Sequence, residues 1–228
     1  MSQNLLNRIF TSIILLSLLF FVNFSNQYIF ILSILILGTI ICIEANNIFL
    51  RLVGFKSSKD MMLKKFNFKF LTLNLITFIY VFFIFGNLSF EIYSNEGSIF
   101  FLYLMCLCIF TDIGGYVFGK VIGGKKLSKI SPNKTISGTI GSFLFSLLPL
   151  IFLLNFNYLD LEFNINNITF CLLISLISQL GDLFISYLKR KSKIKDTGKI
   201  LPGHGGILDR VDGIIFAVPF SYILLKII

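Results

Sequence analysis

The chain consists of long apolar runs separated by short polar segments. The seven runs cover residues 9–24, 28–43, 70–86, 97–119, 138–158, 167–188 and 211–228. A bilayer core about 30 Å thick needs about 20 mostly apolar residues per helix. The runs are continuously apolar and lack the alternation of a β-barrel wall. The pattern therefore predicts an all-α fold, a polytopic membrane bundle of about seven transmembrane helices.

Composition supports this interpretation. Of the 228 residues 56% are hydrophobic, 28 are Phe, and the mean hydropathy is +0.88. A soluble domain of this length cannot cover so many apolar side chains with polar ones. Arg8 precedes the first run as in a signal peptide, but no cleavage site follows, so we expect a retained helix. The cysteines lie in apolar runs without metal-site spacing, which favours buried thiols.

Charges alternate between the connecting segments. The second, fourth and sixth segments are basic, and the first, third and fifth contain no Lys or Arg. The basic residues are Arg51, Lys56, Lys59, Lys64, Lys65 and Lys69, then Lys120, Lys125, Lys126, Lys129 and Lys134, then Lys189, Arg190, Lys191, Lys193, Lys195 and Lys199. We count Glu44 and Asp60 as acids of the second segment. The positive-inside rule places the basic segments and the N-terminus in the cytoplasm, with Lys226 as one exception.

Acidic residues occur near the ends of apolar helices, at Asp112, Asp182, Asp209 and Asp212. An ionised carboxylate near hydrocarbon is costly, so such residues are expected to face a bundle interior, a cation or water. Ser175, Ser178, Asp182 and Ser186 form a polar stripe at positions i, i+3, i+7 and i+11 of one helix. Gly115 and Gly119 provide a small-residue face for close helix packing.

The simplest joint interpretation is one polar chamber, open to the cytoplasm, where these helix ends converge. Carboxylates without His or Cys partners suit Mg²⁺. Magnesium usually binds through one or two carboxylates together with substrate phosphates. Numerous Lys and Arg residues and glycine loops beside the acids favour a phosphate-and-metal site over a proton relay.

A long polar motif occupies residues 186–212. It contains Ser186, Lys189-Arg190, Lys195-Asp196, Gly198, Pro202-Gly203-His204-Gly205-Gly206, Asp209-Arg210 and Asp212. This motif closely resembles the signature of the phosphatidate cytidylyltransferases (CDP-diacylglycerol synthases). A second stretch is also similar to that family: Asp112 to Lys120, Gly124-Lys125-Lys126, Ser131 to Thr135, and Gly138. The resemblance covers about the C-terminal half, and Gly181-Asp182 fits it as well.

Two departures from the family pattern are noted. The chain is short for this family, which predicts that a peripheral helix is missing. Ser137 stands where members often have an acid. The resemblance divides the chain into residues 1–96, transmembrane helices of low specificity, and residues 97–228, a catalytic region with two basic cytoplasmic loops and the signature.

The resemblance implies transfer of CMP from CTP to phosphatidic acid, giving CDP-diacylglycerol and pyrophosphate, with Mg²⁺ required. The lipid phosphomonoester, with a second pKa of about 6, is already largely ionised at neutral pH, so no general base is needed. Charge neutralisation and positioning are the main demands. We assign Asp182 and Asp209 as metal ligands, with Asp112 and Asp212 as further candidates.

The remaining site residues are assigned to phosphate and substrate contacts. Catalytic contacts fall to Lys189, Arg190 and Arg210. Substrate contacts fall to Lys120, Lys125, Lys126, Ser131, Lys134, Thr135, Lys195, Asp196, Gly203, His204, Gly205 and Gly206. The run from Pro202 to Gly206 offers backbone N–H groups that could cradle an anion. Residues 131–135 are expected to begin a helix whose N-terminus favours phosphate.

Two alternatives stay open. One is a related CTP-dependent enzyme that acts on another lipid phosphate or a polyprenol, and the other is a membrane transporter. The Ile-, Asn-, Lys- and Phe-rich composition suggests a bacterial protein, which we expect in the inner (cytoplasmic) membrane with its active site facing the cytoplasm. The resemblance further suggests a homodimer, and we expect no nucleic-acid partner.

Overall fold

The computed structural model describes residues 3–55, 67–128, 131–156 and 162–227, and these ranges are helical apart from short connections. The elements are α1 (Gln3–Asn23), α2 (Gln27–Leu52), α4 (Phe68–Ile79), η1 (Tyr80–Gly86), α5 (Asn87–Asn95), α6 (Gly97–Val121), α7 (Ile136–Ser146), α8 (Leu148–Phe156), α9 (Ile165–Lys191), α10 (Leu208–Val211) and α11 (Ile214–Leu225). The predicted all-α class is confirmed.

Six helical segments in the described ranges are long and apolar enough to cross a membrane. They are Leu6–Asn23, Gln27–Leu52, Phe68–Asn95, Gly97–Val121, Ile136–Leu154 and Ile165–Lys191. They correspond to the first six predicted runs. The seventh run differs: its helix begins at Ile214, after a break at Asp212 and Gly213, and has 12 residues. Twelve residues rise about 18 Å, less than the bilayer core requires.

The chain forms two compact units. Unit 1 comprises Met1–Asn87 and Leu188–Val211, and unit 2 comprises Leu88–Tyr187 and Asp212–Ile228. Most of the signature thus packs with the N-terminal helices. The sequence-based division at residue 96 rests on motif content, and the contact pattern does not test it.

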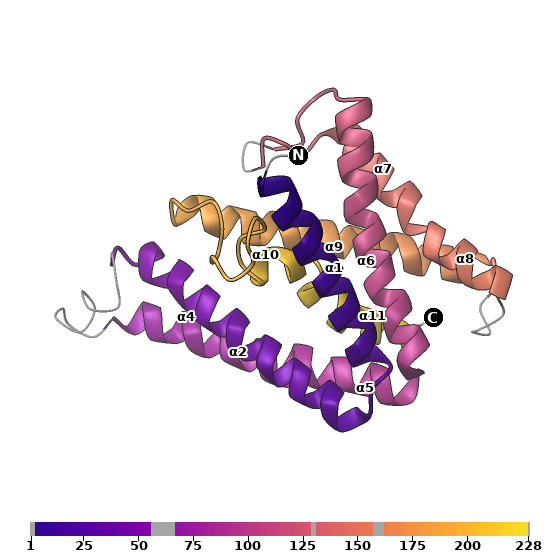
Figure 1. Ribbon diagram of the computed structural model, residues 1–228, viewed down its shortest axis with the longest axis horizontal. Helices are drawn as coiled ribbons and strands as arrows, with labels where there is room; N and C mark the ends of the chain where they lie inside the picture. Colours follow the sequence, from indigo (N-terminus) through magenta and orange to yellow (C-terminus); the bar gives the residue numbers. More distant parts are fainter. Residues whose placement is uncertain (1–2, 56–66, 129–130, 157–161, 228) are drawn as a thin grey trace. The chain divides into compact units, whose positions relative to one another are not determined.

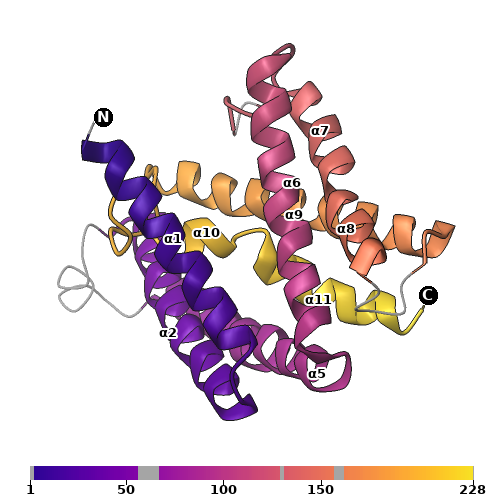
Figure 2. The same cartoon turned by 45° about the vertical axis from the view of Figure 1, so that its right-hand side comes forward.

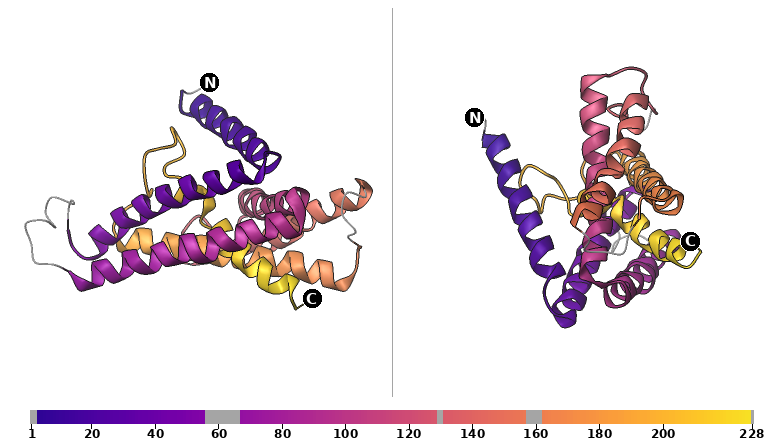
Figure 3. Two further views of the ribbon diagram at one scale, coloured as in Figure 1. Left: turned by 90° about the horizontal axis from the view of Figure 1, so that it is seen from below. Right: turned by 90° about the vertical axis from the view of Figure 1, so that its right-hand side faces the viewer.

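Unit 1 is built on α2. The α2 helix lies beside α4 and η1 (Figures 1 and 3). Gly38 permits this approach, because a Cβ there would lie 2.9 Å from the ring of Phe82. The α1 helix turns into α2 at Asn26, whose side chain caps α2 by accepting from Ile29 N. Only 11% of the α1 span is buried, so most of its apolar surface is available to lipid.

In unit 2, α6 and α7 lie side by side and pack closely (Figure 2). Glycines line both sides of the contact. A Cβ on Gly115 would lie 2.7 Å from Ser142 Oγ, and one on Gly138 would lie 2.7 Å from the Gly115 carbonyl. Gly119 approaches Thr135 and Gly138. The small-residue packing face predicted at Gly115 and Gly119 is therefore present.

Three sequence-based boundaries were wrong, one of them the end of the third run at residue 86, because its helical span continues to Asn95. The second apolar helix does not end at residue 43 but continues to Leu52, because Ala45, Ile48 and Phe49 extend its buried face. Glu44 is consequently a helix residue and not a loop acid. The α7 helix begins at Ile136, and Ser131–Thr135 forms the turn before it, with Thr135 as the N-cap. Lys56, Lys59, Asp60, Lys64, Lys65 and Lys129 lie outside the described residues.

Candidate functional site

The signature segment in unit 1 folds into a tight loop between α9 and α10. Leu201 N donates to Gly205 O at 2.9 Å, and His204 N donates to Leu201 O at 3.0 Å. Gly203 and Gly205 have φ of 78° and 86°, a region that residues with a Cβ rarely adopt. The glycines of the motif are thus needed to close the loop.

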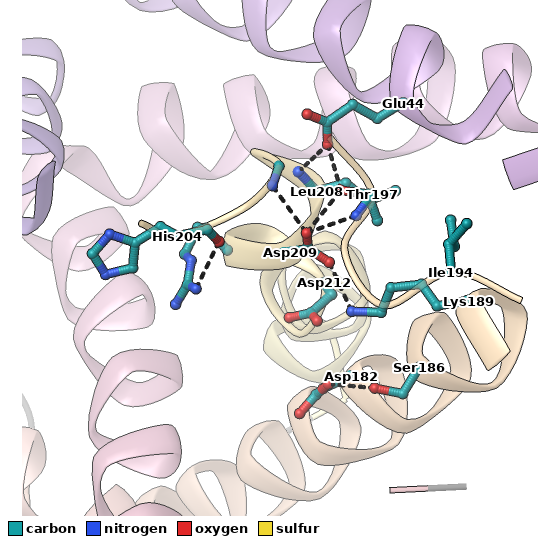
Figure 4. Close-up of polar contacts among 12 residues, drawn as sticks. Glu44, Asp182, Ser186, Lys189, Ile194, Thr197, His204, Leu208, Asp209 and Asp212 are labelled. Atoms are coloured by element: carbon teal, nitrogen blue, oxygen red, sulfur yellow. Dashed lines mark hydrogen bonds and ion pairs between the residues drawn. The ribbon is translucent and has the colours of Figure 1, made fainter. Parts of the chain in front are cut away.

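Asp209 is the internal anchor of this loop (Figure 4). Its Oδ2 accepts from Thr197 N at 2.8 Å, Gly206 N at 2.9 Å and Thr197 Oγ1 at 3.1 Å. Its Oδ1 accepts from Lys189 Nζ at 2.7 Å, and the two side chains of this ion pair are only 7% and 11% exposed. One carboxylate therefore ties both ends of the loop to the end of α9.

The same contacts set the acidity of Asp209. Burial works to raise the pKa of the carboxyl, but Lys189 and the N–H groups of Thr197 and Gly206 outweigh it and lower the pKa. A depressed pKa in the folded state means that the ionised carboxylate stabilises the fold above the unfolded-state pKa, about 3.9. This stabilisation is lost as the pH falls through the lower pKa of the folded state.

A pH prediction follows. The difference in melting temperature between the wild type and Asp209→Asn in detergent should be constant from pH 7 to about pH 5 and should shrink below about pH 4. Thermal melts at each pH measure this difference. If the difference in melting temperature began to shrink near pH 6, the pKa of Asp209 would be raised. Burial would then outweigh Lys189 and the N–H groups, contrary to this prediction.

Glu44 holds the loop from a different helix. Its side chain is 1% exposed within α2. Oε1 accepts from Ile207 N at 3.0 Å, and Oε2 accepts from Thr197 Oγ1 at 2.7 Å and from Leu208 N at 2.8 Å. Three donors thus solvate a buried carboxylate, as Figure 4 shows for two of them, Thr197 and Leu208. Sequence reasoning missed this residue, although the rule applied to the other acids of apolar helices would have selected it.

Two signature glycines make room for Glu44. A Cβ on Gly198 would lie 2.5 Å from Glu44 Oε1, and a Cβ on Gly206 would collide with Thr197 Oγ1 and Glu44 Oε2. At Ser192, next along the chain from α9, the side chain donates to Ile48 O at 3.1 Å. The signature loop therefore packs closely against α2. Gly198 and Gly206 of the motif are needed because a Cβ at either position would collide with Glu44, about 150 residues earlier in the chain.

An open pocket of about 580 Å³ lies against the loop. Among the described residues, four cationic side chains line it: Arg8, Lys195, Lys199 and Arg210. Asp196 is the one carboxylate among these described lining residues. Such an excess of positive charge around a glycine-rich turn suits a phosphate-bearing anion.

Backbone amides of the loop are already engaged. His204 N and Gly205 N donate to Leu201 O, and Gly206 N donates to Asp209. In this structure these three N–H groups close the loop, and an anion cradle at this run stays a prediction.

His204 is fixed by α1. Its Nδ1 hydrogen-bonds to Thr11 Oγ1, which lies 2.9 Å from Asn7 O and 3.0 Å from Arg8 O. Because the hydroxyl has one proton, which it donates to one of these carbonyls, it accepts from Nδ1–H. Burial, then Arg210 and Arg8, lower the pKa of His204 and favour the neutral ring. This geometry fits a loop-fixing role.

The remaining predicted residues of unit 1 lie at the loop edges. Arg190 is exposed and donates to Ile194 O at 3.3 Å, and Arg210 donates to His204 O at 2.9 Å. Lys195 and Asp196 are exposed at the pocket.

Unit 2 contains a second polar group around Asp182. Asp182 forms an ion pair with Lys134 through Oδ2 and accepts from Ser186 Oγ at 3.2 Å through Oδ1. The neighbouring Gly181 lets α9 approach closely, because a Cβ there would lie 2.8 Å from Asp212 O. The structure thus brings together two residues that the sequence selected, Lys134 and Asp182, and places the backbone of Asp212 beside Gly181.

The basic connection between α6 and α7 contains Lys134, the ion-pair partner of Asp182. Thr135 accepts from Gly138 N at 3.1 Å as the cap of α7, and Lys126 pairs with it as an isolated bridge. Ile136 N donates to Lys125 O at 3.0 Å, and Lys134 N donates to Ser131 O at 3.1 Å. The side chains of Lys120, Lys125 and Lys126 are exposed, and so is Asp112 on α6.

The predicted acids are divided between the units. Asp112, Asp182 and Asp212 belong to unit 2, and Asp209 belongs to unit 1. Their convergence in one chamber stays a prediction.

The fold and these groups define a helical membrane protein with a cationic pocket beside a glycine-rich loop. A sequence model of the Cytidylyltransferase family matches residues 6–228. The chain belongs to this family.

Individual relatives carry a more specific name than the family. This chain is 46% identical to the phosphatidate cytidylyltransferase of Staphylococcus aureus (strain COL) over 135 residues. The aligned residues are 58% of this chain and 50% of that protein. The protein of the same name from Staphylococcus haemolyticus (strain JCSC1435) is 42% identical over 144 positions, 61% of this chain and 54% of that protein. The chain thus matches about half the length of these curated relatives.

Proposed function

We propose that the chain transfers CMP from CTP to phosphatidate, forming CDP-diacylglycerol and releasing pyrophosphate. A phosphate oxygen of the lipid would form a bond to the α-phosphorus of CTP, and the bond from that phosphorus to the β-phosphate oxygen would break. The observation that carries the proposal is the cationic pocket at the signature loop. The name and 46% identity of the Staphylococcus aureus relative support the choice of substrates.

The residues of the chain would act mainly through charge and position. Lys195, Lys199 and Arg210 would neutralise phosphate oxygens as two anionic substrates approach each other. Asp209 and Glu44 would hold the loop that presents these cations. No side chain has to remove a proton from the lipid phosphate, because its second pKa is about 6.

Mg²⁺ is part of the proposal. Within the described ranges, no group of three or more His, Cys, Asp or Glu side chains is placed to hold a metal, and Mg²⁺ normally takes only one or two carboxylates plus phosphates and water. Asp182 fits such a role better than Asp209, since its side chain is 23% exposed and that of Asp209 is only 7% exposed. Asp209 fits loop anchoring, because Thr197 and Gly206 donate three hydrogen bonds to one of its oxygens and Lys189 pairs with the other. A bound divalent ion would supply neutralisation of phosphate charge.

We further propose that the pocket faces the cytoplasm of a bacterial cell, in its inner membrane. The alternation of basic segments supports this orientation. The homodimer stays a prediction from the family resemblance.

A turnover assay tests the proposed function. The purified protein in detergent should release pyrophosphate from CTP only when phosphatidate and Mg²⁺ are both present, with CDP-diacylglycerol as the lipid product. Asp182→Asn should lower this rate by on the order of 100-fold, because it removes the charge that would hold the metal.

Glu162→Gln provides the matched control, since Glu162 is exposed and remote in sequence from the motifs. Its rate should equal that of the wild type. Transfer of label from CTP only to another lipid phosphate, or solute flux in liposomes without nucleotide consumption, would contradict the proposal.

A further inference from the structure

The N-terminal helix α1 supplies part of the cationic pocket. Arg8, Thr11 and Ser12 lie at positions i, i+3 and i+4, so they share one face of the helix. That face meets the signature loop: Arg8 Nε donates to Gly203 O at 3.1 Å, and the two hydroxyls contact the ring nitrogens of His204. The sequence comparison with the family signature assigned no role to these residues.

Arg8 has the chemistry of a phosphate ligand at this position. Its guanidinium carries five N–H donors in a planar fork, and the contact with Gly203 uses one of them. The side chain lines the same pocket as Lys195, Lys199 and Arg210. A role limited to docking α1 would not require a charged group, because the contact with Gly203 is to an uncharged carbonyl.

We infer that Arg8 binds a substrate phosphate in this pocket and that α1 forms one of its walls. The inference deepens the proposed function and rests on it. The phosphate belongs to either CTP or the lipid, and the lipid is the favoured source. Large apolar side chains beside Arg8, such as Leu6, Ile9 and Phe10, are 43–66% exposed. They offer lipid-facing surface for acyl chains next to a cationic site for the headgroup.

Steady-state kinetics of Arg8→Gln tests the inference. The variant should raise the KM for phosphatidate by about 10-fold or more, since a charge-assisted contact is lost, with the KM for CTP changed less than 3-fold. Arg8→Lys should recover part of the loss, because it keeps the charge but not the fork. Arg51→Gln, at the exposed end of α2, is the matched control and should behave as the wild type.

A second variant separates phosphate binding from helix docking. Thr11→Val removes the bond to His204 but leaves the charge of Arg8 in place, so its KM for phosphatidate should rise less than that of Arg8→Gln. If Thr11→Val matched Arg8→Gln, docking of α1 would explain the effect and the inference would fail. A rise confined to the KM for CTP would keep the phosphate contact and assign it to the nucleotide.

Ligand-induced thermal shifts make the test independent of turnover. Dihexanoyl phosphatidate and CTP, added separately, should stabilise the wild type, and the shift with one of them should be lost in Arg8→Gln but kept in Arg51→Gln. Equal shifts in the wild type and Arg8→Gln would overturn the inference. A wild type that binds these ligands without turnover would contradict the proposed function alone.

Discussion

Glu44→Gln is expected to lower kcat/KM by on the order of 100-fold, although the change is isosteric and lies in a transmembrane helix. The buried carboxylate accepts from Ile207 N, Leu208 N and Thr197 Oγ1. An amide turns one of its two oxygens into a donor, which leaves donors facing each other in a buried site. Displacement of a site by about 1 Å can cost about 100-fold in rate.

Hydrogen–deuterium exchange gives a structural measurement of the same variant. The amides of residues 207 and 208 should exchange faster in Glu44→Gln, while those of α6 should be unchanged. Gly206→Ala should reproduce both effects, because its Cβ would enter the space of the Glu44 carboxylate. Normal turnover and normal exchange in Glu44→Gln would show that the loop does not depend on this residue.

Asp209→Asn is expected to have a comparable effect for a different reason. It leaves Lys189 without its ion-pair partner while the lysine side chain is 11% exposed. Breaking a buried pair by removing one charge costs about 3–5 kcal/mol. The variant should therefore lose both turnover and thermal stability.

The double variant Lys189→Met with Asp209→Asn separates the cost of an unpaired Lys189 charge from the loss of the loop anchor. It removes the unpaired lysine and should recover part of the melting temperature but not the turnover, because the loop is still untied from α9. Raising Mg²⁺ should not rescue Asp209→Asn if the residue anchors the loop. Rescue by Mg²⁺ would instead identify Asp209 as a metal ligand.

The amino-acid sequence predicted the helices well where one physical rule dominated. Apolar runs located six spans to within a few residues at most ends, because the cost of an unpaired backbone group in lipid leaves few other structures. A second single rule predicted the glycine face of α6: close packing of helices in a membrane requires small residues. The last run was harder, since Asp212 and Gly213 interrupt it and hydropathy averages over such a break.

The contacts of the loop were less predictable. The sequence selected Asp209, Lys189 and His204, but it did not indicate that Asp209 ties down the loop or that His204 is held by Thr11. Glu44 was missed because its partners are more than 150 residues away and because a boundary drawn at residue 43 placed it among loop acids. Local patterns carry no information on such a pairing.

The separation of Glu44 from its partners has a consequence for biosynthesis. The donors that surround its carboxylate are 153 to 164 positions further along the chain. A ribosome adding about 5–20 residues per second makes them roughly 10–30 s after Glu44 itself. During that interval the nascent second helix has an acid near hydrocarbon without these partners, a costly arrangement. The helix is therefore made well before the hydrogen bonds that its buried acid accepts in the folded protein can form.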